Sequence, residues 1–337
     1  MWRAGVAEGN PTGFSGAEGG VDRGRADLRR RGTWYTLAPM SADAVLPAAV
    51  AEPPPGIQGI VRQARRPSGW VAPGPRPVTP ADRLELWPGE GEDLCYLAGD
   101  FRILQRIDGH RWSADDLITA WYAAERFAAA PPRRFVDLGC GIGTVLLFLA
   151  WRFPEARGAG VEAQALSAGM ARRSVAWNGL TERCEVRLGD LREAASIAGL
   201  GPAELVTGTP PYLPPGSGPE SSHVQRGPCR FEHRGGVEAY CEAAARLLAP
   251  GGSFVGCAAA FQRDRVARAV EAAGLALVGW RDVVPRAGKG PLFAVYAARS
   301  AENAEACVEE PPLVIRGSDG RFSTESNAVC RAMGMPV

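Results

Sequence analysis

The fold of this chain is decided by the stretch Phe135-Val136-Asp137-Leu138-Gly139-Cys140-Gly141-Ile142-Gly143-Thr144. A short apolar run contains an acid near its end, three glycines follow at alternate positions, and a second apolar run spans 145–151. This pattern predicts a buried strand, a tight turn and the start of a helix. Glycines let the backbone turn sharply and approach a ligand closely, and a helix start offers free N–H groups to it.

The spacing of the glycines separates two kinds of nucleotide site. A dinucleotide fingerprint needs Gly-x-Gly-x-x-Gly, and its third glycine would fall on Thr144. The observed Gly-x-Gly-x-Gly after an acid resembles the first motif of class I S-adenosylmethionine-dependent methyltransferases. The resemblance implies that this cofactor is bound by Asp137, Gly139, Gly141 and Gly143. A glycine-rich turn that binds no ligand is the alternative interpretation.

Acids also end the next two predicted strands. Glu162 closes the run 158–162, about twenty residues beyond the loop, where α/β nucleotide folds place a carboxylate on ribose hydroxyls. Its alternative role is a helix cap or surface group. Asp190 follows the predicted strand 184–188, and in class I methyltransferases an acid there meets the adenine amino group. Three acids after three consecutive strands are a more specific signal than the glycines alone.

The fourth predicted strand, 203–207, leads into the proline-rich turn Thr209-Pro210-Pro211-Tyr212. Two prolines stiffen the exit of the strand at the crevice where open α/β sheets bind ligands. The turn resembles the N-P-P-Y motif of amino-group methyltransferases, with Thr209 in place of Asn. The resemblance implies that Thr209, Pro210 and Tyr212 are catalytic, that Thr209 also touches the cofactor and that Tyr212 stacks on the substrate. A proline-stiffened turn without a substrate role is the alternative.

A long polar loop, 216–236, follows this turn. Loops of this length in a compact domain are usually functional or disordered. Its mixture of Arg, His and Phe suits a phosphate-bearing or acidic substrate, and we expect Arg226 and Arg230 to bind substrate. His223 and His233 lack a third ligand at metal spacing, so we predict no metal site. The alternative is a solvated lid without specific contacts.

The pattern along the chain predicts one α/β domain between two less regular segments. Residues 1–85 carry Pro and Gly clusters without sustained periodicity, which predicts disorder or a start codon assigned too early. Residues 86–300 are expected to form a Rossmann-like methyltransferase domain, with a mostly parallel seven-stranded sheet, helices on both faces and a C-terminal antiparallel hairpin. The resemblance to methyltransferases implies that its first segment helps to cover the cofactor. Residues 301–337 form a tail that packs on the domain or carries a lid.

Composition limits the other classes of protein. The 337-residue chain is 46% apolar with a net charge of +1, which argues neither for nor against a polyanionic partner. Its eight cysteines include no C-x-x-C pair, which argues against a zinc knuckle or redox dithiol. No apolar run approaches the roughly 20 residues of a membrane span. We therefore expect a cytoplasmic protein without membrane contact, and a monomer is favoured.

Residues 94–300 resemble, as a whole, bacterial adenine-N6 tRNA methyltransferases of the valine-tRNA type. The resemblance rests on the segments 99–105, 108–111, 113–116, 137–143, 210–212 and 314–321. It implies S-adenosylmethionine as cofactor, tRNA or another RNA as partner, and adenine N6 as methyl acceptor. Thr209 departs from the family motif, because its side chain is shorter and carries no amide. Together with the extended loop, this indicates a divergent branch.

Three alternatives stay open on the sequence. In the first alternative, the methyl acceptor is a protein glutamine or a small molecule. Glutamine is included because related N-P-P-Y enzymes act on it. In the second, the chain binds S-adenosylmethionine and transfers nothing. The third is a nicotinamide dehydrogenase, against which Thr144 at the third glycine position counts.

Overall fold

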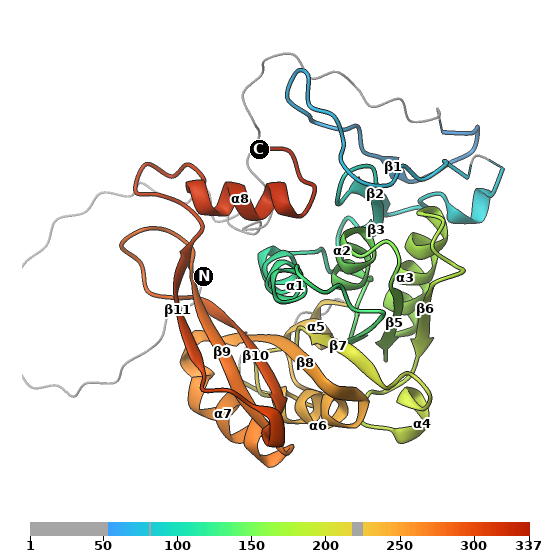
Figure 1. Ribbon diagram of the computed structural model, residues 1–337. Helices are drawn as coiled ribbons and strands as arrows, with labels where there is room; N and C mark the ends of the chain where they lie inside the picture. The colour runs from blue at the N-terminus through green and yellow to red at the C-terminus, as the bar shows by residue number, and fades with distance from the viewer. Residues whose placement is uncertain (1–52, 81, 218–224) are drawn as a thin grey trace, which may run out of the picture. The chain divides into compact units, whose positions relative to one another are not determined.

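A computed structural model describes residues 53–80, 82–217 and 225–337. The described residues all belong to one compact unit. The helices and strands of this unit are labelled in Figure 1. No helix of the described part is long and apolar enough to cross a membrane.

The centre of the fold is an eight-stranded sheet with the order β11-β9-β10-β8-β7-β4-β5-β6. The five strands from β8 to β6 run parallel, β10 is antiparallel to both of its neighbours, and β11 is parallel to β9. The strands are β4 Arg134–Leu138, β5 Arg157–Glu162, β6 Cys184–Leu188, β7 Ala203–Gly208, β8 Leu248–Ala259, β9 Leu275–Val284, β10 Phe293–Ser300 and β11 Val308–Val314. The predicted Rossmann-like α/β class is confirmed.

Helices cover both faces of this sheet and enclose two apolar cores (Figure 1). One core contains side chains of α1, α2, α3 and α8, and the other contains side chains of α6 and α7. The helices are α1 Ala114–Arg126, α2 Thr144–Arg152, α3 Ala165–Trp177, α4 Ala194–Ile197, α5 Arg226–Arg230, α6 Val237–Leu247, α7 Arg263–Ala272 and α8 Thr324–Ala332, with short 3-10 turns η1 Leu84–Leu86, η2 Ala260–Gln262 and η3 Ala301–Asn303.

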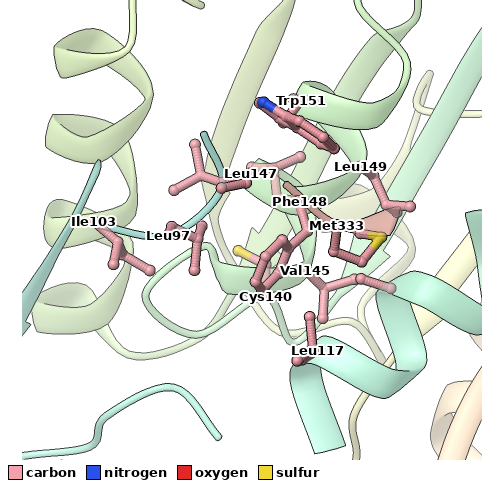
Figure 2. Close-up of a cluster of buried hydrophobic side chains, with 14 of the residues drawn as sticks. Leu97, Ile103, Leu117, Cys140, Val145, Leu147, Phe148, Leu149, Trp151 and Met333 are labelled. Atoms are coloured by element: carbon pink, nitrogen blue, oxygen red, sulfur yellow. The ribbon is translucent and has the colours of Figure 1, made fainter. Parts of the chain in front are cut away.

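Helix α2 is buried nearly all round, because it follows the glycine loop into the centre of the first core. Figure 2 shows its side chains between the β2–β3 segment, which contributes Leu97 and Ile103, and Met333 near the C-terminus. Leu117 of α1 closes the same cluster. A helix that is apolar on every side is stable only when it is covered in this way.

A small second sheet precedes the main domain. It consists of β1 Ile60–Val61, β2 Glu92–Tyr96 and β3 Arg102–Arg106. Its antiparallel β2–β3 hairpin packs on α3, where Ser174 Oγ accepts a hydrogen bond from the main chain of Leu104 at 3.0 Å.

The expectation of disorder up to residue 85 does not fit residues 53–80 and 82–85. Strand β1 pairs with β2, and Arg62 forms a 2.8 Å ion pair with the buried Asp93. Arg66 forms another with Asp100 at 2.6 Å. Because ion pairs and one short strand hold this segment, it lacks the periodic apolar pattern by which order is read from sequence. Residues 1–52 of the same predicted segment lie outside the described residues.

The sheet has one strand more than the predicted seven, because the tail adds β11 beside β9. Pro311 and Pro312 hide this strand from sequence analysis, since proline is rare in strands. An edge strand tolerates proline, and the register shifts between Glu310 and Leu313 around the two prolines. The rest of the tail forms α8, which packs into the first core. This part of the tail therefore packs on the domain.

The direction of the strands brings distant segments to one edge of the sheet. Strands β4, β5, β7 and β8 are parallel, so their C-terminal ends lie at the same edge. Strands β9 and β11 end at this edge too, because β10 is antiparallel to β8 and β9. In open α/β sheets this is the edge where ligands bind.

Candidate functional site

Asp137 fixes the start of the glycine loop. Its carboxylate is buried at the end of β4, where Oδ1 accepts a hydrogen bond from Thr207 Oγ1 at 2.9 Å and Oδ2 one from the main-chain N–H of Leu146 at 3.2 Å. Burial raises the pKa of Asp137 to about 7, outweighing the two hydrogen bonds, which act in the opposite direction. The side chain thus joins β4 to β7 and to the first turn of α2.

The glycine loop leaves open space beside Gly141. This residue has φ of +56°, a conformation that favours glycine, and a side chain added there would meet no atom within 4 Å. Gly139 and Gly143 also have positive φ, of +60° and +90°. The hydroxyl of Tyr240 lies against Gly139, so this side of the loop is filled by α6. The face at Gly141 is therefore the one that a ligand can approach.

Glu162 supports the loop from the neighbouring strand. Its Oε2 accepts a hydrogen bond from the N–H of Gly141 at 2.9 Å, and Oε1 accepts one from the N–H of Gln164 at 2.7 Å. The residue is only 7% exposed, and burial raises its pKa. An ionised carboxylate has about four lone-pair sites, so Glu162 retains acceptor capacity for two hydroxyls.

Asp190 lies at the end of the next strand, β6, and forms an ion pair that the sequence did not predict. Its carboxylate binds the guanidinium of Arg192 through two hydrogen bonds of 2.7 and 2.9 Å, and these lower its pKa. The N–H of Gly189 donates to the carbonyl of Glu162 at 2.9 Å, so both acids lie at adjacent strand ends. The positive charge of Arg234 acts on both: it partly offsets the rise that burial causes in the pKa of Glu162, and it adds to the lowering of the pKa of Asp190 by Arg192. An adenine contact of Asp190 stays a prediction.

The turn Thr209–Tyr212, which we call the acceptor motif, follows β7 and lies directly beside the glycine loop. Strands β4 and β7 are adjacent and parallel, with Leu138 paired with Gly208. Residues 139–143 and 209–212 therefore leave neighbouring strands at one level. Thr209 is half-buried, and Pro210 is buried.

Tyr212 is held from three sides. Its hydroxyl lies 2.9 Å from Cys257 Sγ on β8 and donates to Asp115 Oδ2 on α1 at 3.3 Å. Its main-chain carbonyl accepts a hydrogen bond from Gln262 Nε2 at 3.1 Å. Burial raises the pKa of the phenol, so the group stays neutral. These contacts fix the direction of the ring.

Sequence reasoning missed the partners of Tyr212. Asp115 and Asp116 begin α1, and the sequence indicates only a helix cap, which the structure contains as a 2.9 Å hydrogen bond from Ser113 N–H to Asp116. Asp115 nevertheless lies at the site, because it accepts a hydrogen bond from the Tyr212 hydroxyl at 3.3 Å. Burial is the main reason why the pKa values of Tyr212 and Cys257 are raised, and the charges of Asp115 and Asp116 raise them further. The sequence held one signal by which these acids could have been found, namely a second acid, Asp115, beside the capping residue Asp116. No feature of the sequence marked Cys257 or Gln262 as residues of the site.

The described part of the long loop, residues 225–236, lies against the site. Gln225 is buried, and its Oε1 accepts the N–H of His110 at 2.9 Å while its Nε2 donates to Ser167 Oγ at 3.1 Å. Cys229 lies 3.7 Å from Gln164 Nε2, close to Glu162. This part of the loop is thus held by specific hydrogen bonds, unlike the solvated lid of the alternative interpretation.

The predicted substrate residues of the loop differ in their surroundings. Arg230 is exposed, and its carbonyl accepts the N–H of Leu213 at 3.1 Å, which places it beside the acceptor motif. The side chain of Arg226 and all of His223 lie outside what the structure describes. Phe231 is only 2% exposed and is therefore not free to stack on a substrate.

The donor set of the site fits S-adenosylmethionine. Open space adjoins Gly141, a buried carboxylate with free lone pairs lies beside it, and a second carboxylate ends the next strand. Glu162 would accept the ribose hydroxyls, and Asp190 would be the acceptor for the adenine amino group. Within the described ranges, no group of three His, Cys, Asp or Glu side chains is arranged to hold a metal ion.

Comparison with known proteins agrees with this arrangement. No protein-family model matches the chain. A tRNA1(Val) (adenine(37)-N6)-methyltransferase of Aeromonas hydrophila subsp. hydrophila is 30% identical over 196 residues, which cover 57% of this chain and 78% of that protein. One of the same name from Porphyromonas gingivalis is 30% identical over 144 residues, 42% of this chain. The chain spans only 56% of the length of that relative.

Two further similarities come from other methyltransferases. The 4-amino-L-phenylalanine/4-methylamino-L-phenylalanine methyltransferase of Streptomyces pristinaespiralis is 37% identical over 125 residues, 35% of this chain and 40% of that protein. The crystal structure of a predicted O-methyltransferase from Agrobacterium tumefaciens has a TM-score of 0.50 at 20% identity, and the match covers 66% of this chain and 97% of that one. This second similarity concerns the fold alone.

Strand order, glycine loop and the acids at the strand ends define a class I S-adenosylmethionine-dependent methyltransferase. Within this class, the chain belongs to the family of tRNA1(Val) (adenine(37)-N6)-methyltransferases.

Proposed function

We propose that the protein transfers a methyl group from S-adenosylmethionine to an amino group on a planar substrate, and that this group is N6 of an adenine in tRNA. The observation that carries the proposal is the pairing of β4 with β7, which brings the glycine loop and Thr209–Tyr212 together. The family relation supports the adenine, since the relatives from Aeromonas hydrophila and Porphyromonas gingivalis are named for adenine N6 of tRNA1(Val).

The residues of this chain have mainly to align the acceptor amine. S-adenosylmethionine, when bound, supplies an activated methyl group with a neutral leaving group. The carbonyl of Pro210 and the hydroxyl of Thr209 are acceptors that would bind the N–H groups of the amine and direct its lone pair. Tyr212 would offer its ring to the base, and such stacking is worth about 1–3 kcal/mol per base. No strong general base is required.

Thr209 leaves a second acceptor open. Its hydroxyl replaces the amide of the N-P-P-Y motif, so the site has lost one donor–acceptor pair. The relative from Streptomyces pristinaespiralis is named for an aromatic amine on an amino acid, which makes an aryl amine the second candidate. Both acceptors present a planar ring and an amino group.

Transfer of a labelled methyl group separates the candidates. The parent protein is offered a valine-tRNA transcript, 4-amino-L-phenylalanine and a glutamine-containing peptide, and we expect label in the tRNA at adenine N6. Thr209→Asn should preserve or raise this activity, because it restores the amide. Label in the amino acid or the peptide alone, or loss of a robust tRNA activity in Thr209→Asn, would refute the adenine assignment. Binding of S-adenosylmethionine without transfer to any of them would refute the enzyme.

A further inference from the structure

Two turns at the C-terminal edge of the sheet together carry four cations. Arg286 and Lys289 lie in the turn 285–292 between β9 and β10, and Arg316 and Arg321 lie in the turn 315–323 after β11. We call these four residues the basic edge. The only acid in the two turns is Asp319, which accepts a hydrogen bond from the N–H of Arg321 at 3.0 Å.

The two turns form one surface. The N–H of Ala287 donates to the carbonyl of Arg316 at 2.8 Å, and the guanidinium of Arg286 lies close to Gly320. Figure 1 shows the two loops projecting together beyond the ends of β9 and β11. Arg286, Lys289 and Arg321 are exposed, and no member of the basic edge forms an ion pair with a residue that the structure describes. Other arginines, such as Arg265 with Glu232 and Glu238, are paired.

Exposed apolar side chains connect the basic edge to the acceptor motif. Gln262 donates to the carbonyl of Tyr212, and two residues before it the N–H of Ala260 donates to the carbonyl of Leu292 at 3.3 Å. Between these two contacts lies Phe261, which is 75% exposed, and Leu292 is 45% exposed. A continuous path of neighbouring residues thus runs from Tyr212 past an exposed aromatic ring to the cations.

Unpaired cations beside an exposed aromatic ring suit a ligand with regularly spaced anions and flat faces. Single-stranded RNA has both, since its phosphates attract cations and its bases stack on aromatic side chains. An acidic protein surface would use the cations but leave Phe261 without a matching group.

We propose that the basic edge and Phe261 bind the single-stranded RNA that flanks the target nucleotide. This rests on the proposed function, in which the target base reaches Tyr212. Each cation that binds a phosphate contributes about 0.7 to the slope of log affinity against log salt for single strands.

The test compares two triple variants with the same change in net charge. R286A/K289A/R321A removes the exposed cations of the edge, whereas R133A/R246A/R268A removes three exposed arginines elsewhere on the surface. Binding of a valine-tRNA transcript and of an unstructured RNA is measured by fluorescence anisotropy at several salt concentrations. We expect only the first variant to lose at least about tenfold in affinity, with a salt slope lower by about 2. Its affinity for S-adenosylmethionine should equal that of the parent.

Lys289 provides a second measurement, because it is the only lysine of the chain. Its acetylation by an amine-reactive reagent is followed by mass spectrometry. RNA should slow this acetylation, and polyglutamate at equal charge should not. Equal protection by polyglutamate would favour an acidic protein partner and overturn the RNA assignment.

The outcomes for the edge and for the enzyme are distinguishable. If the parent methylates tRNA and both triple variants bind RNA equally well, the edge proposal is overturned and the function stands. If the parent binds RNA through the edge but transfers no methyl group, the proposed function is overturned and the edge proposal stands. A parent that does not bind RNA overturns both.

Discussion

The main-chain N–H of Gly141 donates a 2.9 Å hydrogen bond to the carboxylate of Glu162, so the loop and the second strand of the site hold each other in place. The same carboxylate binds the start of α3 through the N–H of Gln164. Glu162 is therefore both a support for the loop and a candidate ligand for ribose.

The Glu162→Ala variant tests this double role. It removes the ribose acceptors and should weaken binding of S-adenosylmethionine by roughly 1.5–3 kcal/mol, or about ten- to a hundredfold, as measured by calorimetry. Glu182→Ala, at an exposed position before β6, is the control and should bind like the parent. Parent-like binding by Glu162→Ala would remove Glu162 from the site.

The buried carboxylate of Asp137 should make stability depend on pH. Burial raises its pKa from a usual value near 3.8 to about 7, so the folded state holds this proton more tightly than the unfolded state. The stabilisation from the protonated group is complete below about pH 4 and is lost as pH rises through about 7.

Asp137→Asn is neutral at every pH and should remove this dependence. At pH 8 its free energy of unfolding should exceed that of the parent by up to about 4 kcal/mol, and at pH 4 the two should converge. Urea unfolding at both pH values measures the difference in unfolding free energy between parent and variant. The contributions of the other titrating groups are the same in both proteins and cancel in this difference. An identical pH dependence in parent and variant would show that folding does not shift the pKa of Asp137.

The segment before β2 should contribute to stability through Arg66. Its guanidinium binds Asp100 at 2.6 Å and the carbonyl of Gly99 at 3.0 Å, and it lies 4.7 Å from the ring centre of Tyr96. Hydrogen bonds of a charged group contribute about 1.5–3 kcal/mol, so Arg66→Ala should lower the unfolding free energy by about that amount. The neighbouring Arg65 is exposed, and Arg65→Ala should unfold like the parent. Equal unfolding of both variants would mean that the contacts of Arg66 add nothing to stability.

The hydroxyl of Tyr212 should orient the ring. Tyr212→Phe keeps the ring but loses the contacts with Asp115 and Cys257, so we expect kcat to fall by about tenfold, in line with one lost hydrogen bond. Tyr212→Ala should abolish turnover. Binding of S-adenosylmethionine should be unchanged in both, which calorimetry checks. An unchanged kcat in Tyr212→Ala would remove the ring from the acceptor site.

Elements with local signals were predictable from the sequence. Helix α1 has such signals, because Ser113 caps its start and prolines follow its end, and β6 matches its predicted range Cys184–Leu188. The contacts that depend on distant segments were not predictable. The contacts of the Tyr212 hydroxyl join α1 and β8, which are more than a hundred residues apart in sequence. Strand β11 forms only because it pairs with β9. No local pattern encodes such pairings.

The indole of Trp151 in Figure 2 lies where three distant parts of the chain meet. It packs against Gly74, Gly99 and Gly334, each so closely that a methyl group there would overlap the ring. The N–H of Gly99 also donates to the carbonyl of Gly334 at 2.7 Å. Because Gly334 is synthesised long after Gly74, Gly99 and Trp151, this corner of the core stays open until that later segment has left the ribosome. Until then, the nascent domain carries an uncovered tryptophan.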